Sequence, residues 1–249
     1  MIWPFSRRKA TLPLLDDTLW RQAVAGLPWL RRIDADRGQR LRQLVTEFLR
    51  DKAITPLQGL RLNEVQRLRL AMLCCLPLLE FGREGLHGWS QLLVYPQAFR
   101  VQRNHMDAQG VLHEWDDELI GEAWERGPVI LSWADVRADI ATPDDGFCVV
   151  AHEIAHKLDA LDGAMDGTPP LPRDWQRQWA SDFQRAYEGL CNAVDAGRET
   201  TIDPYAAESP EEFFAVCTEH HFSDSANLRK AMPDVAAHLQ RFYGPPLLA

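Results

Sequence analysis

Residues 151–159 read AHEIAHKLD and contain two histidines four residues apart, His152 and His156, with Glu153 between them. Residues at this spacing lie on one face of an α-helix, so both imidazoles can reach the same metal ion. A carboxylate beside the first histidine can hold and deprotonate a water bound to that ion. We therefore expect residues 146–162 to form one helix that carries a zinc site.

The apolar residues around this motif follow the period of a helix. At about 100° per residue, one narrow apolar strip contains Phe147, Val150, Ile154, Leu158 and Leu161. The opposite side carries His152, His156 and Asp159, and Glu153 lies between the two sides. The pattern predicts that one face packs against the core while the other presents ligands, with Asp159 as a candidate outer partner of a ligand.

A catalytic zinc ion usually has three protein ligands and a water, so a third ligand is needed. One candidate is Asp162, six residues after His156, although Asp159 stands where a glycine would ease the required turn. The other candidates are carboxylates of a later segment, namely Glu208, Glu211, Glu212 and Glu219.

A helix is expected over residues 209–222, with Ser209 as its N-cap. In this helix Glu212 and Glu219 share the face opposite Phe213 and Phe214. We therefore favour Glu212 as the ligand and Glu219 as an outer partner of a ligating imidazole. Glu211 is rotated to the side and is the second choice.

Two further residue types are expected to stay outside the metal site. Adjacent histidines point about 100° apart on a helix, so His220 is expected near the surface and His221 on the apolar side. The five cysteines are odd in number and form no CxxC pair, which argues against disulfides or an all-cysteine zinc site.

The order of the predicted elements indicates an α+β fold with a small mixed sheet. Helices are expected at 34–52, 63–80, 173–194, 209–222 and 233–242, and residues 56–60 are expected to link the first two. Short apolar runs at 91–96 and 128–133 are typical of strands, with a weaker candidate at 111–115. We expect a helical region, 1–85, packed on a catalytic domain, 86–249, as one compact unit.

Composition restricts the function classes. The 249 residues carry 36 acids against 27 bases, a formal net charge of −9, which argues against a nucleic-acid partner. The most apolar window, 71–81, contains Pro77 and is too short to span a bilayer, and the N-terminus lacks the charge order of a signal peptide. We therefore expect a soluble, cytoplasmic protein with no membrane partner.

Several segments together resemble the Mlc titration factor A family of bacterial zinc metallopeptidases. They are AHEIAHKLD at 151–159, DPYAAESPEEFFAV at 203–216, PLQGL at 56–60, CCLPLLE at 74–80, LVYP at 93–96 and GPVILSW at 127–133. The resemblance covers roughly residues 35–245. It implies a zincin fold similar to the catalytic domain of anthrax lethal factor.

The resemblance also implies roles for individual residues. His152, His156 and Glu212 match the zinc ligands, Glu153 matches the general base, and Tyr205 matches a tyrosine near the zinc. A phenol at that place can donate a hydrogen bond to the oxyanion of a tetrahedral intermediate. The family further implies a partner, the repressor Mlc, whose binding relieves repression of glucose-uptake genes.

Two functional hypotheses follow. The first is a zinc-dependent peptidase with aminopeptidase-like action, in which strand 129–133 is the sheet edge that pairs with an extended peptide substrate. The second is a regulatory protein that sequesters a transcriptional repressor and holds zinc for structure alone. A structural zinc needs no general base, so the presence of Glu153 favours the first.

Overall fold

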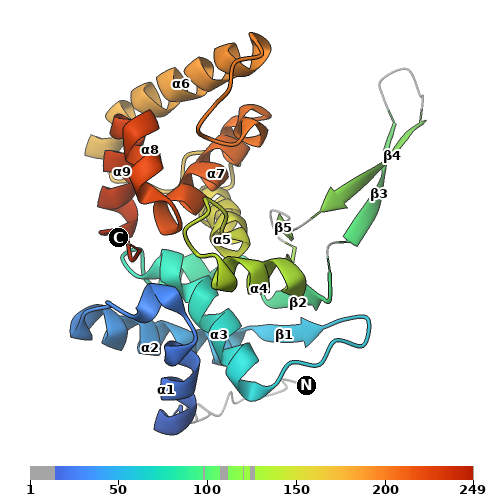
Figure 1. The fold of residues 1–249 in the computed structure, drawn as a ribbon, viewed down its shortest axis with the longest axis vertical. Coiled ribbons are helices and arrows are strands. Elements are labelled where there is room, and N and C mark those ends of the chain that lie inside the picture. The colour runs from blue at the N-terminus through green and yellow to red at the C-terminus, as the bar shows by residue number, and fades with distance from the viewer. Residues whose placement is uncertain (1–14, 98, 107–111, 120, 124–126, 249) are drawn as a thin grey trace, which may run out of the picture.

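The computed structural model describes residues 15–97, 99–106, 112–119, 121–123 and 127–248 (Figure 1). Its α-helices are α1 (Asp17–Ala25), α2 (Ala35–Asp51), α3 (Glu64–Cys75), α4 (Trp133–Ala141), α5 (Val149–Asp159), α6 (Arg173–Asp195), α7 (Pro210–Phe222), α8 (Ser225–Ala231) and α9 (Pro233–Tyr243). Its strands are β1 (Ala53–Pro56), β2 (Gln91–Tyr95), β3 (Phe99–Met106), β4 (Leu112–Leu119), β5 (Gly121–Ala123) and β6 (Val129–Ser132). Helices and a small mixed sheet occur together, as expected for an α+β fold.

The helices predicted from apolar periodicity are present, and local caps fix where several of them begin. The side chain of Asn63 accepts from the backbone of Gln66 while the Gln66 side chain accepts from the backbone of Asn63, a capping box at the start of α3. Ser209 caps α7, as expected. The predicted helix at 63–80 ends earlier as an α-helix, at Cys75, and continues as a 3₁₀ turn over Leu76–Leu78.

The main sheet has four strands in the order β1-β2-β6-β5. The first three strands are parallel, with Leu92 of β2 beside Val129 of β6, and β5 pairs antiparallel with β6. Strand β6 is therefore an inner strand with all four residues buried. The expectation that strand 129–133 forms the free edge for substrate is wrong, because β2 and β5 occupy both of its sides.

Local patterns missed several elements, namely α4, α8, β1, β3 and β5. Strand β1 takes up the start of the expected linker at 56–60, because Ala53–Pro56 pairs with β2. Helices α4 and α8 are too short to show a clear apolar period. The weak strand candidate at 111–115 is confirmed from residue 112 as part of β4, which pairs antiparallel with β3; residue 111 lies outside the described residues.

Helix α5 lies at the centre of the molecule. In Figure 1, α6–α9 lie above it and α1–α3 below it, and it contacts α7, α3, β5 and β6. Ten of its eleven residues are buried. Within the described part of the chain, no helix has the length and apolar character needed to cross a membrane.

Candidate metal centre

Helix α5 begins at Val149, three residues later than the sequence suggested. Gly146 adopts a φ of +99°, in the left-handed region that favours glycine, and so breaks the chain before the helix. Phe147 consequently lies outside α5 and its side chain is 54% exposed, which corrects its expected place on the buried strip. The helix also stops as an α-helix at Asp159, with a 3₁₀ turn over Ala160–Asp162.

Two carboxylates from other helices accept from the first free N–H groups of α5. Asp139 of α4 accepts from Val149 N–H at 2.8 Å, and Glu219 of α7 accepts from Cys148 N–H at 2.8 Å. Such acceptors satisfy groups that have no partner within the helix. Burial raises the pKa of Asp139 to about 7. No local pattern indicates a role for Asp139, because α4 is too short to show a clear apolar period.

Three potential ligand atoms converge between α5 and α7. The Nε2 atoms of His152 and His156 lie 3.1 Å apart, and Glu212 Oε2 lies 3.2 Å from the first and 3.5 Å from the second. Among the described residues, these three side chains are the group arranged to hold a metal ion. The turn of α5 brings the histidines together, and packing of α7 against α5 adds the carboxylate.

Glu219 contacts both His152 and the backbone at the start of α5, the helix that carries His152. Its Oε1 lies 2.8 Å from His152 Nδ1, while its Oε2 accepts from Cys148 N–H. A hydrogen bond at Nδ1 leaves Nε2 as the nitrogen with a free lone pair, which is how partners of metal-binding histidines fix the ring and its tautomer. Burial lowers the pKa of His152, but the carboxylates of Glu219 and Glu212 outweigh burial and hold it well above its ordinary value.

Glu153 lies on the same helix with its carboxylate almost fully enclosed. The residue is 2% exposed, and its Oε2 has no hydrogen-bond partner among the described residues. Burial raises its pKa to about 8. Burial also opposes ionisation of Glu212, yet the imidazoles of His152 and His156, which face its Oε2 at 3.2 and 3.5 Å, keep the pKa of Glu212 far below its ordinary value. The two carboxylates therefore differ in proton affinity by environment alone.

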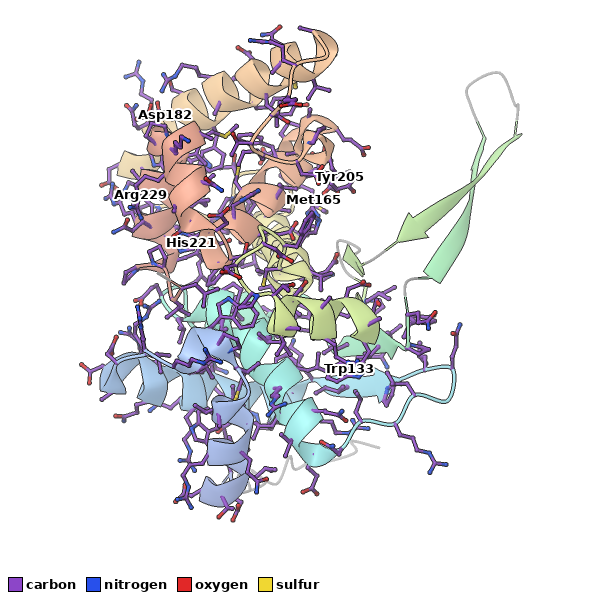
Figure 2. The ribbon with its side chains drawn as sticks, viewed as in Figure 1. Trp133, Met165, Asp182, Tyr205, His221 and Arg229 are labelled. Carbon is purple, nitrogen blue, oxygen red and sulfur yellow. The ribbon has the colours of Figure 1, made fainter. Side chains whose placement is uncertain are left out.

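Tyr205 lies in the 3₁₀ turn η5 (Pro204–Ala207), which packs beside α7 (Figure 2). Its ring centroid is 6.3 Å from that of His152. Burial and the Glu212 carboxylate raise the pKa of the phenol above its ordinary value, so it stays a protonated hydrogen-bond donor.

The other candidate ligands do not join the converging atoms. Asp162 is exposed and accepts from Ala164 N–H, and Glu208 and Glu211 lie beside the three ligand atoms without joining them. Asp159 is fully buried and accepts from Gly167 N–H at 2.9 Å, a bond that supports the loop after α5.

His220 departs from expectation. It is only 7% exposed, and it lines the same cleft as the ligand atoms instead of lying near the surface. His221 is buried on the apolar side, as expected. The cleft has a volume of about 940 Å³ and is bounded by α4, the segment before α5, η5 and α7.

The chain is similar to known proteins over nearly its whole length. The model of the family described as glucose-regulated metallo-peptidase M90 matches residues 3–244. Mlc titration factor A of Escherichia fergusonii is 36% identical over 250 aligned positions, covering 99% of this chain and 92% of that protein. The protein of the same name from Serratia proteamaculans is also 36% identical, over 99% of this chain and 94% of its own length. The matches extend over nearly the whole chain, and the chain therefore belongs to the glucose-regulated metallo-peptidase M90 family.

Proposed function

We propose that this protein is a zinc-dependent peptidase with aminopeptidase-like action, built on a zincin fold. The observation that carries the proposal is the convergence of His152 Nε2, His156 Nε2 and Glu212 Oε2 at mutual distances of 3.1, 3.2 and 3.5 Å. Tetrahedral zinc with ligands at about 2.0–2.1 Å requires ligand atoms roughly 3.3–3.4 Å apart. Two imidazoles and one carboxylate are also a donor set typical of catalytic zinc.

Zinc in this place would polarise a peptide carbonyl and make an attacking water more acidic. The residues of the chain supply the remaining chemistry. Glu153 accepts the proton of the attacking water at its unpartnered Oε2, and a pKa raised by burial to about 8 suits a proton acceptor that must later act as a donor. Tyr205 donates from its phenol to the developing oxyanion.

The sheet offers a place for an extended substrate. Strand β5 is the last in the order β1-β2-β6-β5, so its outer edge has no strand partner in the part of the chain that the structure describes. Helix α5 contacts β5, which places this edge beside the helix that carries His152 and Glu153. We propose that the peptide backbone adds to β5 as a further strand, in place of the earlier assignment to 129–133.

A second role rests on the relatives. Proteins named Mlc titration factor A are 36% identical to this chain over nearly its full length. We propose binding of Mlc, or of a similar transcriptional repressor, as a role that can coexist with hydrolysis. If the protein only sequesters a repressor, with zinc structural, repressor binding will be present while hydrolysis is absent.

The test compares zinc-loaded wild type with Glu153→Gln on a panel of chromogenic aminoacyl and peptide substrates, with zinc content measured in both. We expect hydrolysis by the wild type and a loss of at least about 100-fold in kcat for the variant, at equal zinc content. Removing zinc with a chelator should abolish the wild-type activity. Equal activity in both proteins contradicts the role of Glu153, and zinc-loaded wild type that hydrolyses nothing while binding repressor supports the regulatory alternative.

A further inference from the structure

The cleft that holds the ligand atoms is strongly acidic. Nine of its twenty lining residues are carboxylates, and no lysine or arginine lines it within the described residues. Glu153, Glu212 and Glu219 belong to the proposed metal centre. The other six form two groups along the cleft: Asp135, Asp139 and Asp145 from α4 and the segment after it, and Asp203, Glu208 and Glu211 from η5 and the start of α7.

Two of these carboxylates, Asp145 and Asp203, accept hydrogen bonds from neutral donors. Asp145 accepts from Phe147 N–H at 3.1 Å and from Thr142 Oγ at 2.8 Å. Asp203 accepts from Tyr205 N–H at 2.8 Å. These donors are neutral, so they orient the carboxylates without cancelling their charge. A cleft lined by one sign of charge concentrates ligands of the opposite sign and repels those of the same sign.

A large apolar side chain lies within this acidic lining. Phe147 is 54% exposed, and Asp145 holds its backbone in place through the bond to Phe147 N–H. An aromatic ring beside a carboxylate suits a side chain with an aliphatic stem and a cationic end. The stem packs on the ring, the cation is attracted to its face, and the carboxylate pairs with the charge.

A buried, unpartnered nitrogen points to the same class of ligand. His220 is 7% exposed and lines the cleft, and its Nδ1 has no hydrogen-bond partner among the described residues. A Cβ at Gly146 would come within 3.1 Å of the His220 ring, so the glycine keeps this side of the cleft open. Burial lowers the pKa of His220, and a neutral imidazole can accept a hydrogen bond from a cationic N–H group.

We propose that this cleft selects peptides that carry a lysine or arginine side chain next to the bond to be cleaved. Cleavage of such peptides rests on the proposed peptidase function, whereas the binding preference follows from the residues that line the cleft. The one-signed lining discriminates against acidic side chains as well as attracting basic ones, so specificity has both an attractive and a repulsive part.

The first experiment measures kcat/KM of the zinc-loaded wild type on three matched peptides that place arginine, citrulline or glutamate at one position. Citrulline keeps the shape of arginine without the charge. We expect kcat/KM for the arginine peptide to exceed that for the citrulline peptide by about tenfold. The value for the glutamate peptide should be lower than that for the citrulline peptide. The ratio of the arginine value to the citrulline value should decrease as ionic strength rises. Equal values for arginine and citrulline overturn the inference.

The second experiment removes charge from the cleft. Glu208→Gln combined with Asp145→Asn keeps side-chain shape, and asparagine can still accept from Phe147 N–H. We expect the ratio of kcat/KM for the arginine peptide to that for the citrulline peptide to fall by about fivefold. The matched control is Asp36→Asn combined with Glu64→Gln, two exposed acids outside the cleft, which should leave the preference unchanged. An equal effect in both double variants would show a general charge effect and overturn the assignment to the cleft.

A binding measurement separates this inference from the peptidase proposal. Zinc-loaded Glu153→Gln is titrated with fluorescein-labelled arginine and citrulline peptides, and fluorescence anisotropy gives the two Kd values. A tighter Kd for arginine, together with a wild type that hydrolyses nothing, supports the cleft preference and contradicts the peptidase. Equal Kd values, or no measurable binding of either peptide, overturn the preference whether or not the wild type is active.

Discussion

Among the described residues, two partly buried histidine–carboxylate pairs have nearly the same geometry. In the metal centre, His152 Nδ1 lies 2.8 Å from Glu219 Oε1. Between α6 and α9, His238 Nε2 lies 2.9 Å from Asp182 Oδ2. Each pair joins two helices that are distant in sequence, and each consists of an imidazole and a carboxylate.

The surroundings of the two pairs differ. Asp182 also accepts from Gln178 at 2.9 Å and from Arg185 at 2.6 Å, and the His238 ring packs 5.4 Å from that of Trp179. The hydrogen bonds, that from Gln178 foremost, keep the pKa of Asp182 below its ordinary value. No polar atom of Asp182 or His238 is among the buried unpartnered atoms of the described residues.

The metal centre instead leaves buried atoms without partners. They include Glu153 Oε2, His156 Nδ1 and Glu212 Oε2, the last of which meets the two histidine Nε2 atoms within 3.5 Å. Each unpaired buried polar group costs about 1–3 kcal/mol, which a fold tolerates where a ligand or a reaction uses the group. A histidine–carboxylate pair thus marks a candidate site only where neighbouring atoms converge and remain unpaired.

The largest expected effect is on metal binding at the converging atoms. Glu212→Gln should weaken zinc binding by more than about 100-fold, because loss of a ligand exceeds the roughly 10–100-fold cost of losing an outer partner. Competition with a chromogenic chelator measures the affinity. Glu211→Gln is the control and should stay within about threefold of wild type. If Glu212→Gln and Glu211→Gln bind zinc with similar affinity, Asp162 becomes the candidate for the third ligand.

An intermediate effect should separate the two pairs directly. Glu219→Gln weakens the hold on His152 Nδ1 and should reduce zinc affinity by about 10-fold. Asp182→Asn should leave zinc affinity unchanged but lower the free energy of unfolding by about 1–3 kcal/mol, measured by urea denaturation at saturating zinc. If Asp182→Asn changes zinc affinity as much as Glu219→Gln does, the two pairs are not functionally distinct.

The last expected effect is confined to the pH dependence of stability. Burial raises the pKa of Asp159 to about 7, against about 3.9 in an unfolded chain. Between these values the folded state binds the extra proton, so Asp159 lowers the unfolding free energy as pH rises, by at most about 1.4 kcal/mol per pH unit.

Asp159→Asn removes this proton while an amide oxygen can still accept from Gly167 N–H. We expect a flatter curve of unfolding free energy between pH 4 and about 7, measured by denaturant titration at constant zinc saturation. Asp162→Asn is the exposed control and should follow the wild-type curve. An unchanged slope in Asp159→Asn would contradict the raised pKa.

Much of the site could be predicted because helical periodicity is local. The spacing of His152 and His156 and the shared face of Glu212 and Glu219 follow from about 100° per residue, and the structure brings these side chains together. The same reasoning failed at Phe147, because the glycine before it adopts a left-handed conformation and the helix starts later.

Long-range pairing was harder to foresee. The pattern of residues 129–132 correctly indicates a buried strand. It does not indicate which strands flank it, and the pairing with β2 and β5 places it inside the sheet. His220 likewise became a lining residue of the cleft only because α7 packs beside the segment that contains Gly146.

The family, the α+β composition of elements and the side chains capable of holding a metal can be recognised from the sequence alone, because these depend on residue type and short-range spacing. Packing selected, among the carboxylates that the sequence left open, the one beside the two histidines and the one that contacts His152 Nδ1, and it gathered the remaining acids in one cleft. Those outcomes depend on how α4, α5, η5 and α7 pack, and packing is set by contacts between residues far apart in the chain.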